Sequence, residues 1–113
     1  MHLTEKIKND IAVINIKGDF LDENDTSLLQ RKIDSLATDG IKKVVLDLSM
    51  IKRINSNGLS TLISLFDKLR LVGGDLRLAR IDKRLQDILT ITKLVQVFCT
   101  YETAERAIAS YRN

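Results

Sequence analysis

The run KKVVLDLS, residues 42–49, constrains the fold of this 113-residue chain more than any other stretch. Its apolar residues are nearly continuous instead of alternating, which is typical of a central strand that is buried on both faces. A strand of this kind lies in a sheet that helices cover. We therefore expect an α/β protein.

The elements on either side of this run alternate between strand and helix patterns. Residues 3–8, 11–17, 75–80 and 95–100 are the other candidate strands. Helices are expected after Asp22 or Asp25, from residue 56 to 72, after Asp82 and after Thr100, because each of these stretches carries apolar residues at helical spacing. The order ββαβαβαβα predicts one domain over residues 1–113, with a mixed sheet of about five strands and about four helices.

Composition argues against an enzyme or a metal protein. His2 is the only histidine, and it lies at the start of the chain, where side chains are usually loosely held. The only cysteine, Cys99, lies in an apolar stretch, where a small buried thiol is expected. A zinc site and a Ser-His or Cys-His pair are therefore disfavoured, and no cofactor is expected.

Charge and hydropathy also restrict the partners. The net charge is +3, but the basic residues are scattered and the chain has few aromatic residues, so we expect no nucleic-acid binding. No apolar run approaches the roughly 18–20 residues of a membrane span. The first ten residues, MHLTEKIKND, lack the apolar core of a secretory signal. A cytoplasmic protein is expected.

The stretch INSNG, residues 54–58, joins the buried run to the next helix and is open to three interpretations. Asn55, Ser56 and Asn57 are all good helix caps. A catalytic serine is disfavoured, because the G-x-S-x-G pattern and a nearby histidine are both missing. Ser56 could instead be modified, because the start of a helix accommodates a phosphate at little cost.

A family resemblance favours the third interpretation. VVLDLSMIKRINSNGLSTLI, residues 44–63, resembles the signature of STAS domains, in particular bacterial anti-sigma-factor antagonists. That signature has a strand ending in Asp-Leu-Ser, then Asp-Ser-Ser/Thr/Ala-Gly-Leu at the start of a helix. The segment IKGDFLDENDTSLL, with Asp22, is similar to the part of the family that leads into the first helix, and residues 73–98 resemble the family's later elements.

The resemblance implies a function in partner switching that regulates bacterial transcription. It makes Ser56 the phosphoacceptor and places the partner surface at Asp22, Ser49, Asn55, Asn57, Gly58 and Leu59. The implied partners are an anti-sigma factor that is a serine kinase with a histidine-kinase-like ATP fold, and a metal-dependent serine phosphatase. The unphosphorylated protein would bind the kinase as a monomer or weak dimer and release the kinase's target.

Two positions depart from the family pattern. Asn55 replaces the motif aspartate, and Asn57 replaces Ser, Thr or Ala after the phosphoacceptor. Asn55 keeps the shape of aspartate but removes a charge beside Ser56. The sequence therefore also allows a STAS scaffold or sensor that binds a signalling enzyme or a small ligand without being phosphorylated.

Overall fold

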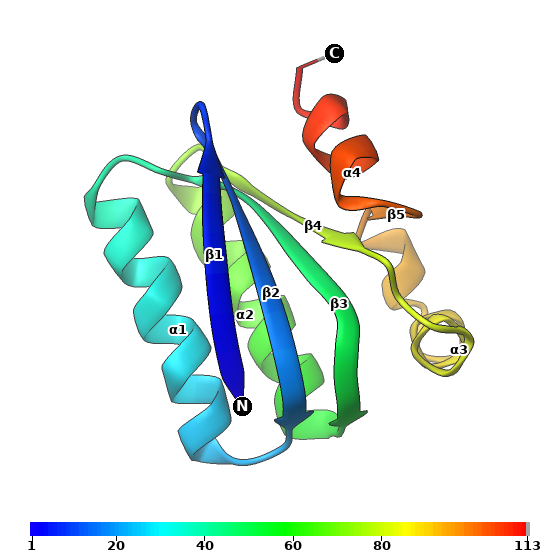
Figure 1. Ribbon diagram of the computed structural model, residues 1–113. Helices are drawn as coiled ribbons and strands as arrows, with labels where there is room; N and C mark the ends of the chain where they lie inside the picture. The colour runs from blue at the N-terminus through cyan, green and yellow to red at the C-terminus, as the bar shows by residue number, and fades with distance from the viewer. Residues whose placement is uncertain (113) are drawn as a thin grey trace.

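A computed structural model of the chain, in which residues 1–112 are described, contains one five-stranded mixed sheet (Figure 1). The strands lie in the sheet in chain order, from β1 at one edge to β5 at the other. β1 is antiparallel to β2, and all the other neighbours are parallel. The strands are β1 His2–Lys8, β2 Ile11–Phe20, β3 Lys43–Ile54, β4 Asp75–Ala79 and β5 Thr100–Tyr101.

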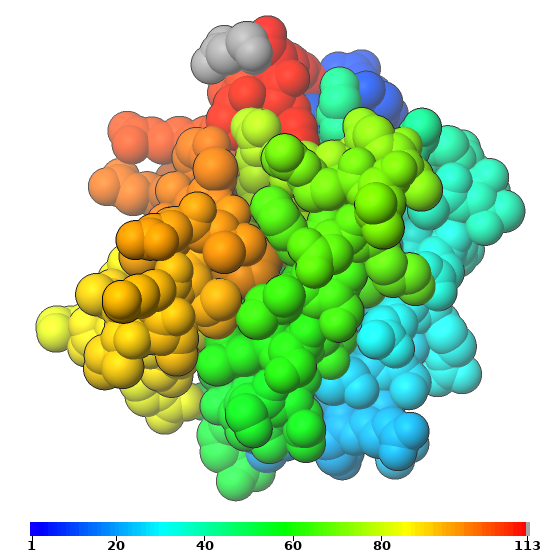
Figure 2. Space-filling model, turned by 180° about the vertical axis from the view of Figure 1, so that it is seen from behind, coloured from blue at the N-terminus to red at the C-terminus, as the bar shows by residue number. Residues whose placement is uncertain are grey.

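Within residues 1–112, four α-helices connect and cover these strands, so the expected order ββαβαβαβα is confirmed. They are α1 Glu23–Thr38, α2 Ser56–Leu71, α3 Lys83–Ile91 and α4 Ala104–Ser110, with a 3₁₀ turn, η1, at Leu94–Gln96. α1 and α2 lie side by side on one face, as Figure 2 shows in cyan and green. None of the helices in residues 1–112 has the length and apolar character needed to cross a bilayer.

Successive side chains of each strand point to opposite faces of the sheet, so the core consists of two apolar clusters, one on each face. On β2, Ile14 and Ile16 belong to the large apolar cluster beneath α1 and α2, whereas Ile11 belongs to a smaller cluster beneath α4. Val44 and Val45 divide in the same way on β3. Burial on both faces explains the continuous apolar run of residues 42–49.

The buried strand is longer than its apolar run predicts. β3 continues through Ser49 to Ile54, and β2 continues past Gly18 to Phe20. The register between them shifts after Asn15 and again after Gly18, and these irregularities carry the pairing beyond the core. The strand therefore does not end at Ser49, as the run of residues 42–49 predicts, and the chain leaves the sheet only at Asn55.

The prediction of a strand over residues 95–100 is also wrong. The backbone N–H groups of Val97 and Phe98 both donate to the carbonyl of Leu94, which holds this stretch in a turn. Phe98 alone is buried there, and Cys99 is exposed, not buried as expected. Strand β5 is limited to two residues, and the cap of α4 is Thr103 instead of Thr100.

Candidate functional site

The first turns of α1 and α2 lie together at one end of the molecule, where β2 and β3 end (Figure 1). β2 and β3 are parallel neighbours, and each leads within a few residues into the helix that follows it. The carboxyl ends of parallel strands are where open α/β sheets place their functional contacts. This end of the molecule therefore carries the candidate site.

The backbone carbonyl of Leu21 joins the two helix starts. It accepts hydrogen bonds from the side-chain amides of Asn55, at 3.1 Å, and Asn57, at 3.3 Å. The Oδ1 atom of Asn55 in turn accepts from the backbone N–H of Gly58 at 3.1 Å and caps α2. Both asparagine side chains are thus hydrogen-bonded within the protein, and Asn55 uses both the nitrogen and the oxygen of its amide.

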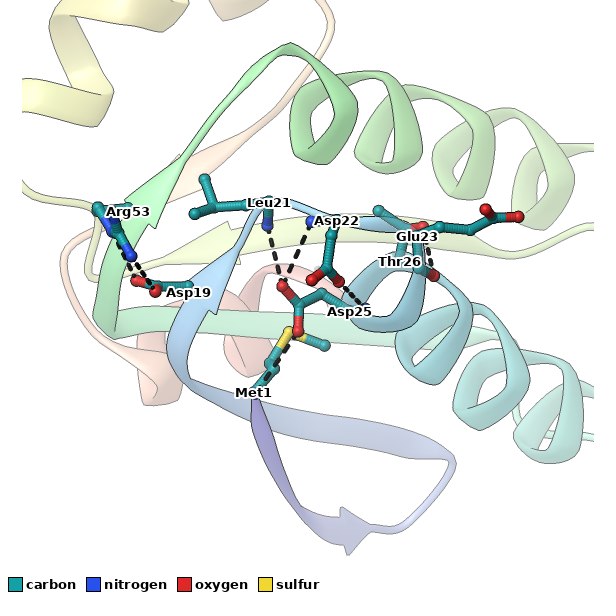
Figure 3. Close-up of polar contacts among 8 residues, drawn as sticks. All are labelled: Met1, Asp19, Leu21, Asp22, Glu23, Asp25, Thr26 and Arg53. Atoms are coloured by element: carbon teal, nitrogen blue, oxygen red, sulfur yellow. Dashed lines mark hydrogen bonds and ion pairs between the residues drawn. The ribbon is translucent and has the colours of Figure 1, made fainter.

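The first turn of α1 is held by a capping box, shown in Figure 3. The side chain of Asp22 accepts from the backbone N–H of Asp25 at 2.9 Å, and the carboxylate of Asp25 accepts from the N–H groups of Leu21 and Asp22. Burial alone would raise the pKa of Asp25, but these hydrogen bonds and the nearby ammonium of Met1 lower it overall. The backbone around Leu21 is therefore held both by the capping box of α1 and by the two asparagines at the start of α2.

Gly58 and Leu59 support this site from beneath. Gly58 is buried, and a Cβ atom there would lie 2.6 Å from the carbonyl oxygen of Phe20 and 2.7 Å from Cγ1 of Ile54. Leu59 is half-buried against the large apolar cluster. Both residues set how closely α2 approaches the ends of β2 and β3. The surface of the candidate site is formed by the more exposed side chains around them.

Ser56 is the first residue of α2 and is exposed. Within residues 1–112, no hydrogen bond engages its hydroxyl, and the first turn of α2 contains no acidic residue. The first N–H groups of a helix lack intrahelical acceptors and carry partial positive charge. An anion at Ser56 would therefore lie on a helix end whose positive charge no carboxylate in the first turn of α2 offsets.

Arg53, three residues before Ser56, has its positive charge paired within the protein. Arg53 forms a two-pronged ion pair with Asp19, its cross-strand neighbour on β2, with Nη2–Oδ2 at 2.6 Å and Nε–Oδ1 at 3.1 Å (Figure 3). The hydrogen bonds from Arg53 lower the pKa of Asp19 below its ordinary value. Arg53 thus joins the ends of β2 and β3, and its charge is largely neutralised.

Five of the six expected partner-binding residues lie around Ser56, but Ser49 does not. It precedes the end of β3 by five residues, roughly 16 Å of extended chain. Its hydroxyl accepts a hydrogen bond from Nη2 of Arg80 at 2.7 Å, next to the bond between Arg80 and Asp47. Asp47 lies beside Val13 and Asn15 on the face of the sheet that α4 packs against, away from α2.

The family can be assigned once this geometry is compared with known proteins. The model of the STAS domain family matches residues 2–107, nearly the whole chain. The chain belongs to the STAS domain family. It is also 25% identical over 103 residues to a Thermotoga neapolitana protein described as a candidate anti-sigma factor antagonist, covering 91% of each chain.

Solved structures show the same fold. An anti-sigma factor antagonist from Mycobacterium paratuberculosis superposes with a TM-score of 0.84 at 21% identity, over 99% of this chain and 94% of that one. The anti-sigma factor antagonist SpoIIAA in its unphosphorylated form gives 0.74 at 17% identity, over 99% of both chains. The phosphorylated form of SpoIIAA, from Bacillus, gives 0.76 at 15% identity, over 97% and 99%. The STAS fold and its five-stranded sheet are confirmed.

The structure gives the Asn55 departure a physical reason. The side-chain amide of Asn55 donates to the Leu21 carbonyl, and an aspartate cannot make that bond. Asn57, the second departure, donates to the same oxygen. In this STAS domain, the two asparagines replace a charge beside Ser56 by a direct connection between the starts of α1 and α2.

Removing Asn55 is therefore expected to cost more than an ordinary helix cap. We expect Asn55→Ala to lower the free energy of unfolding by about 2 kcal/mol, because it removes both the cap and the bond to Leu21. Asn55→Asp keeps the cap and should cost less than about 1 kcal/mol. Urea denaturation measures both, with Ser60→Ala on the exposed side of α2 as the control. An Asn55→Asp variant as stable as wild type would show that the bond to Leu21 contributes little, and equal losses for the two variants would show the same of the cap.

Proposed function

We propose that this STAS domain is an anti-sigma factor antagonist whose binding to a serine kinase is controlled by phosphorylation of Ser56. The observation that carries the proposal is the exposed Ser56 hydroxyl at the start of α2, with no acidic residue in the first turn of that helix. In this proposal the unphosphorylated protein binds the kinase, itself an anti-sigma factor, and so frees the kinase's target. A metal-dependent phosphatase restores the unphosphorylated form.

The surroundings of Ser56 suit a modification that leaves the fold unchanged. A phosphate at this position faces the N–H groups of Ser56 and Asn57, for which Asn55 supplies no acceptor because its Oδ1 atom is bonded to Gly58. The hydrogen bonds that hold the site all lie beneath or beside Ser56 and do not use its side chain. SpoIIAA, of the same fold, has been solved in phosphorylated and unphosphorylated forms, which supports this expectation.

The proposed contact surface comprises the exposed polar groups that surround Ser56. Asp22, Asn55 and Asn57 are exposed, and they come from the starts of both helices. A shallow hollow of about 360 Å³ between Glu23, Thr26, Asn57, Ser60 and Thr61 continues this surface away from Ser56. A partner that covers Ser56 would thus contact α1 and α2 together, and a phosphate would lie inside the contact.

The test is phosphorylation by the serine kinase that binds this protein, followed by intact mass measurement. Wild type should gain one phosphate and Ser56→Ala none, whereas Ser64→Ala, two turns further along α2 and outside the hollow, should be modified at the wild-type rate. Uptake of phosphate by Ser56→Ala at the wild-type rate would assign the acceptor to another hydroxyl. A kinase that binds the wild type tightly but never modifies it would instead indicate a scaffold that acts without phosphorylation.

A further inference from the structure

A second hollow lies on the opposite face of the sheet, between the β1–β2 hairpin and the start of α4. Its volume is about 560 Å³, within the range of roughly 300–1,000 Å³ that is common for small-molecule sites. Cross-strand pairing places Lys6 beside Val13 on this face, and Val13, Ala104 and Ile108 provide an apolar wall. The proposed partner surface around Ser56 contributes no residue to it.

The polar end of this hollow is built around a buried carboxylate. The side chain of Asp47 is 4% exposed, and its only ion-pair partner within residues 1–112 is Arg80, whose Nε lies 3.0 Å from Oδ2. Nη2 of Arg80 donates to the hydroxyl of Ser49, and no hydrogen bond in that part of the chain engages Nη1. The Arg80 side chain is 48% exposed. The guanidinium is therefore held at the mouth of the hollow with one nitrogen free to bind a ligand.

The backbone of Arg80 is in an unusual conformation. Its φ angle of +55° lies in the left-handed region, which costs free energy for a residue other than glycine. Arg80 directly follows β4, and Asp47 lies opposite Ala79 on the parallel neighbour β3. The hollow thus opens near the carboxyl ends of parallel strands, where open α/β sheets bind ligands.

The charged residues that line the hollow indicate the charge of the ligand that it would bind. The lining contains three cations, Lys6, Lys8 and Arg80, and two carboxylates, Asp47 and Glu105, which leaves one positive charge in excess. Asp47 is already paired with Arg80, and no carboxylate of residues 1–112 lies within ion-pair distance of Lys6 or Lys8. A ligand with a single negative charge would balance the site.

We propose that this hollow binds a small organic monocarboxylate, with its apolar body against Val13 and Ile108 and its carboxylate between Arg80 and Lys6. Guanidinium and ammonium groups are the natural partners of such a head group. The apolar wall excludes a fully polar anion as the preferred ligand, because such an anion would leave the wall uncovered. This site does not depend on phosphorylation of Ser56.

Octanoate and its neutral counterpart octanamide are the probes, titrated into the ¹⁵N-labelled full chain and followed by amide chemical shifts. Octanoate should produce saturable shifts at Val13, Asn15, Asp47 and Ala104, with an affinity about tenfold above that of octanamide. The absence of saturable shifts, or equal affinity for the two probes, would overturn the proposal. So would shifts confined to residues outside the hollow.

Two exposed charge variants, which change the charge of the lining in opposite directions, and one control variant test the electrostatic argument. Lys6→Gln should weaken octanoate binding several-fold, and Glu105→Gln should strengthen it several-fold, because each changes the excess charge of the lining in a different direction. Lys83→Gln, on the exposed surface of α3, makes the same charge change as Lys6→Gln and should have no effect. Equal affinities for all variants would overturn the proposal, and no result depends on disturbing the pair of Arg80 with the buried Asp47.

Discussion

Ser56→Asp is expected to weaken binding of the serine kinase by about 2–5 kcal/mol, a loss of roughly thirty-fold to several thousand-fold in affinity. A phosphate brings about −1.5 to −2 charges, and the aspartate variant brings one, into a surface that the partner must desolvate. The starts of α1 and α2 provide exposed amides and carboxylates around Ser56, and the nearby Arg53 is already paired with Asp19. Apart from the positive end of α2, the added charge would thus gain little compensation from this protein. Isothermal titration calorimetry measures the loss.

Matched variants separate charge from shape. Ser56→Asn introduces a side chain of nearly the same size as aspartate but without its charge. This variant should therefore bind the kinase far more tightly than Ser56→Asp. Ser64→Asp adds the same charge two turns further along the exposed side of α2 and should change affinity by less than about 1 kcal/mol. The thermal midpoint of Ser56→Asp should equal or slightly exceed that of wild type, because the carboxylate lies at the positive end of the helix. Weak binding by Ser56→Asn as well would attribute the effect to shape.

The fold could be predicted from the sequence because its strongest signals are local. The run of residues 42–49 reports burial on both faces, and Asp22 and Asp82 mark helix starts that the structure confirms as caps. The stretch 95–100 could not be predicted in the same way. Its β-branched residues favour a strand, but hydrogen bonds to the Leu94 carbonyl and the burial of Phe98 alone hold it in a turn.

The candidate site could be predicted only in part. The residue types identify Asn55 as a cap, but no local pattern shows that Asn55 and Asn57 share the carbonyl of Leu21, 34 and 36 residues away. The family resemblance places Ser49 on the same surface as Ser56, but the extension of β3 separates the two residues. The pair of Asp19 and Arg53 depends on the register between β2 and β3, which two irregularities shift.

Gly58→Ala is expected to destabilise the protein by about 2 kcal/mol, although alanine is normally the better residue in a helix. Helix propensity alone would stabilise the variant by about 1 kcal/mol. The added Cβ would lie 2.6 Å from the Phe20 carbonyl oxygen, a backbone atom that no side-chain rotation can move, and 2.7 Å from Cγ1 of Ile54. Overpacking of this kind costs about 3 kcal/mol at the upper end of its usual range, and it outweighs the gain in propensity. Urea denaturation measures the net loss.

The consequence of Gly58→Ala for the site follows from the same contact. To relieve the clash, α2 must move away from the end of β2, and the segment that moves carries Asn55, Asn57 and Ser56. Hydrogen bonds of 3.1 and 3.3 Å to Leu21 cannot survive a displacement of about 1 Å. Changes in the amide chemical shifts of α1 as well as α2 would therefore accompany the loss of stability. A variant as stable as wild type, with shifts limited to α2, would show that Gly58 does not set the spacing of the two helix starts.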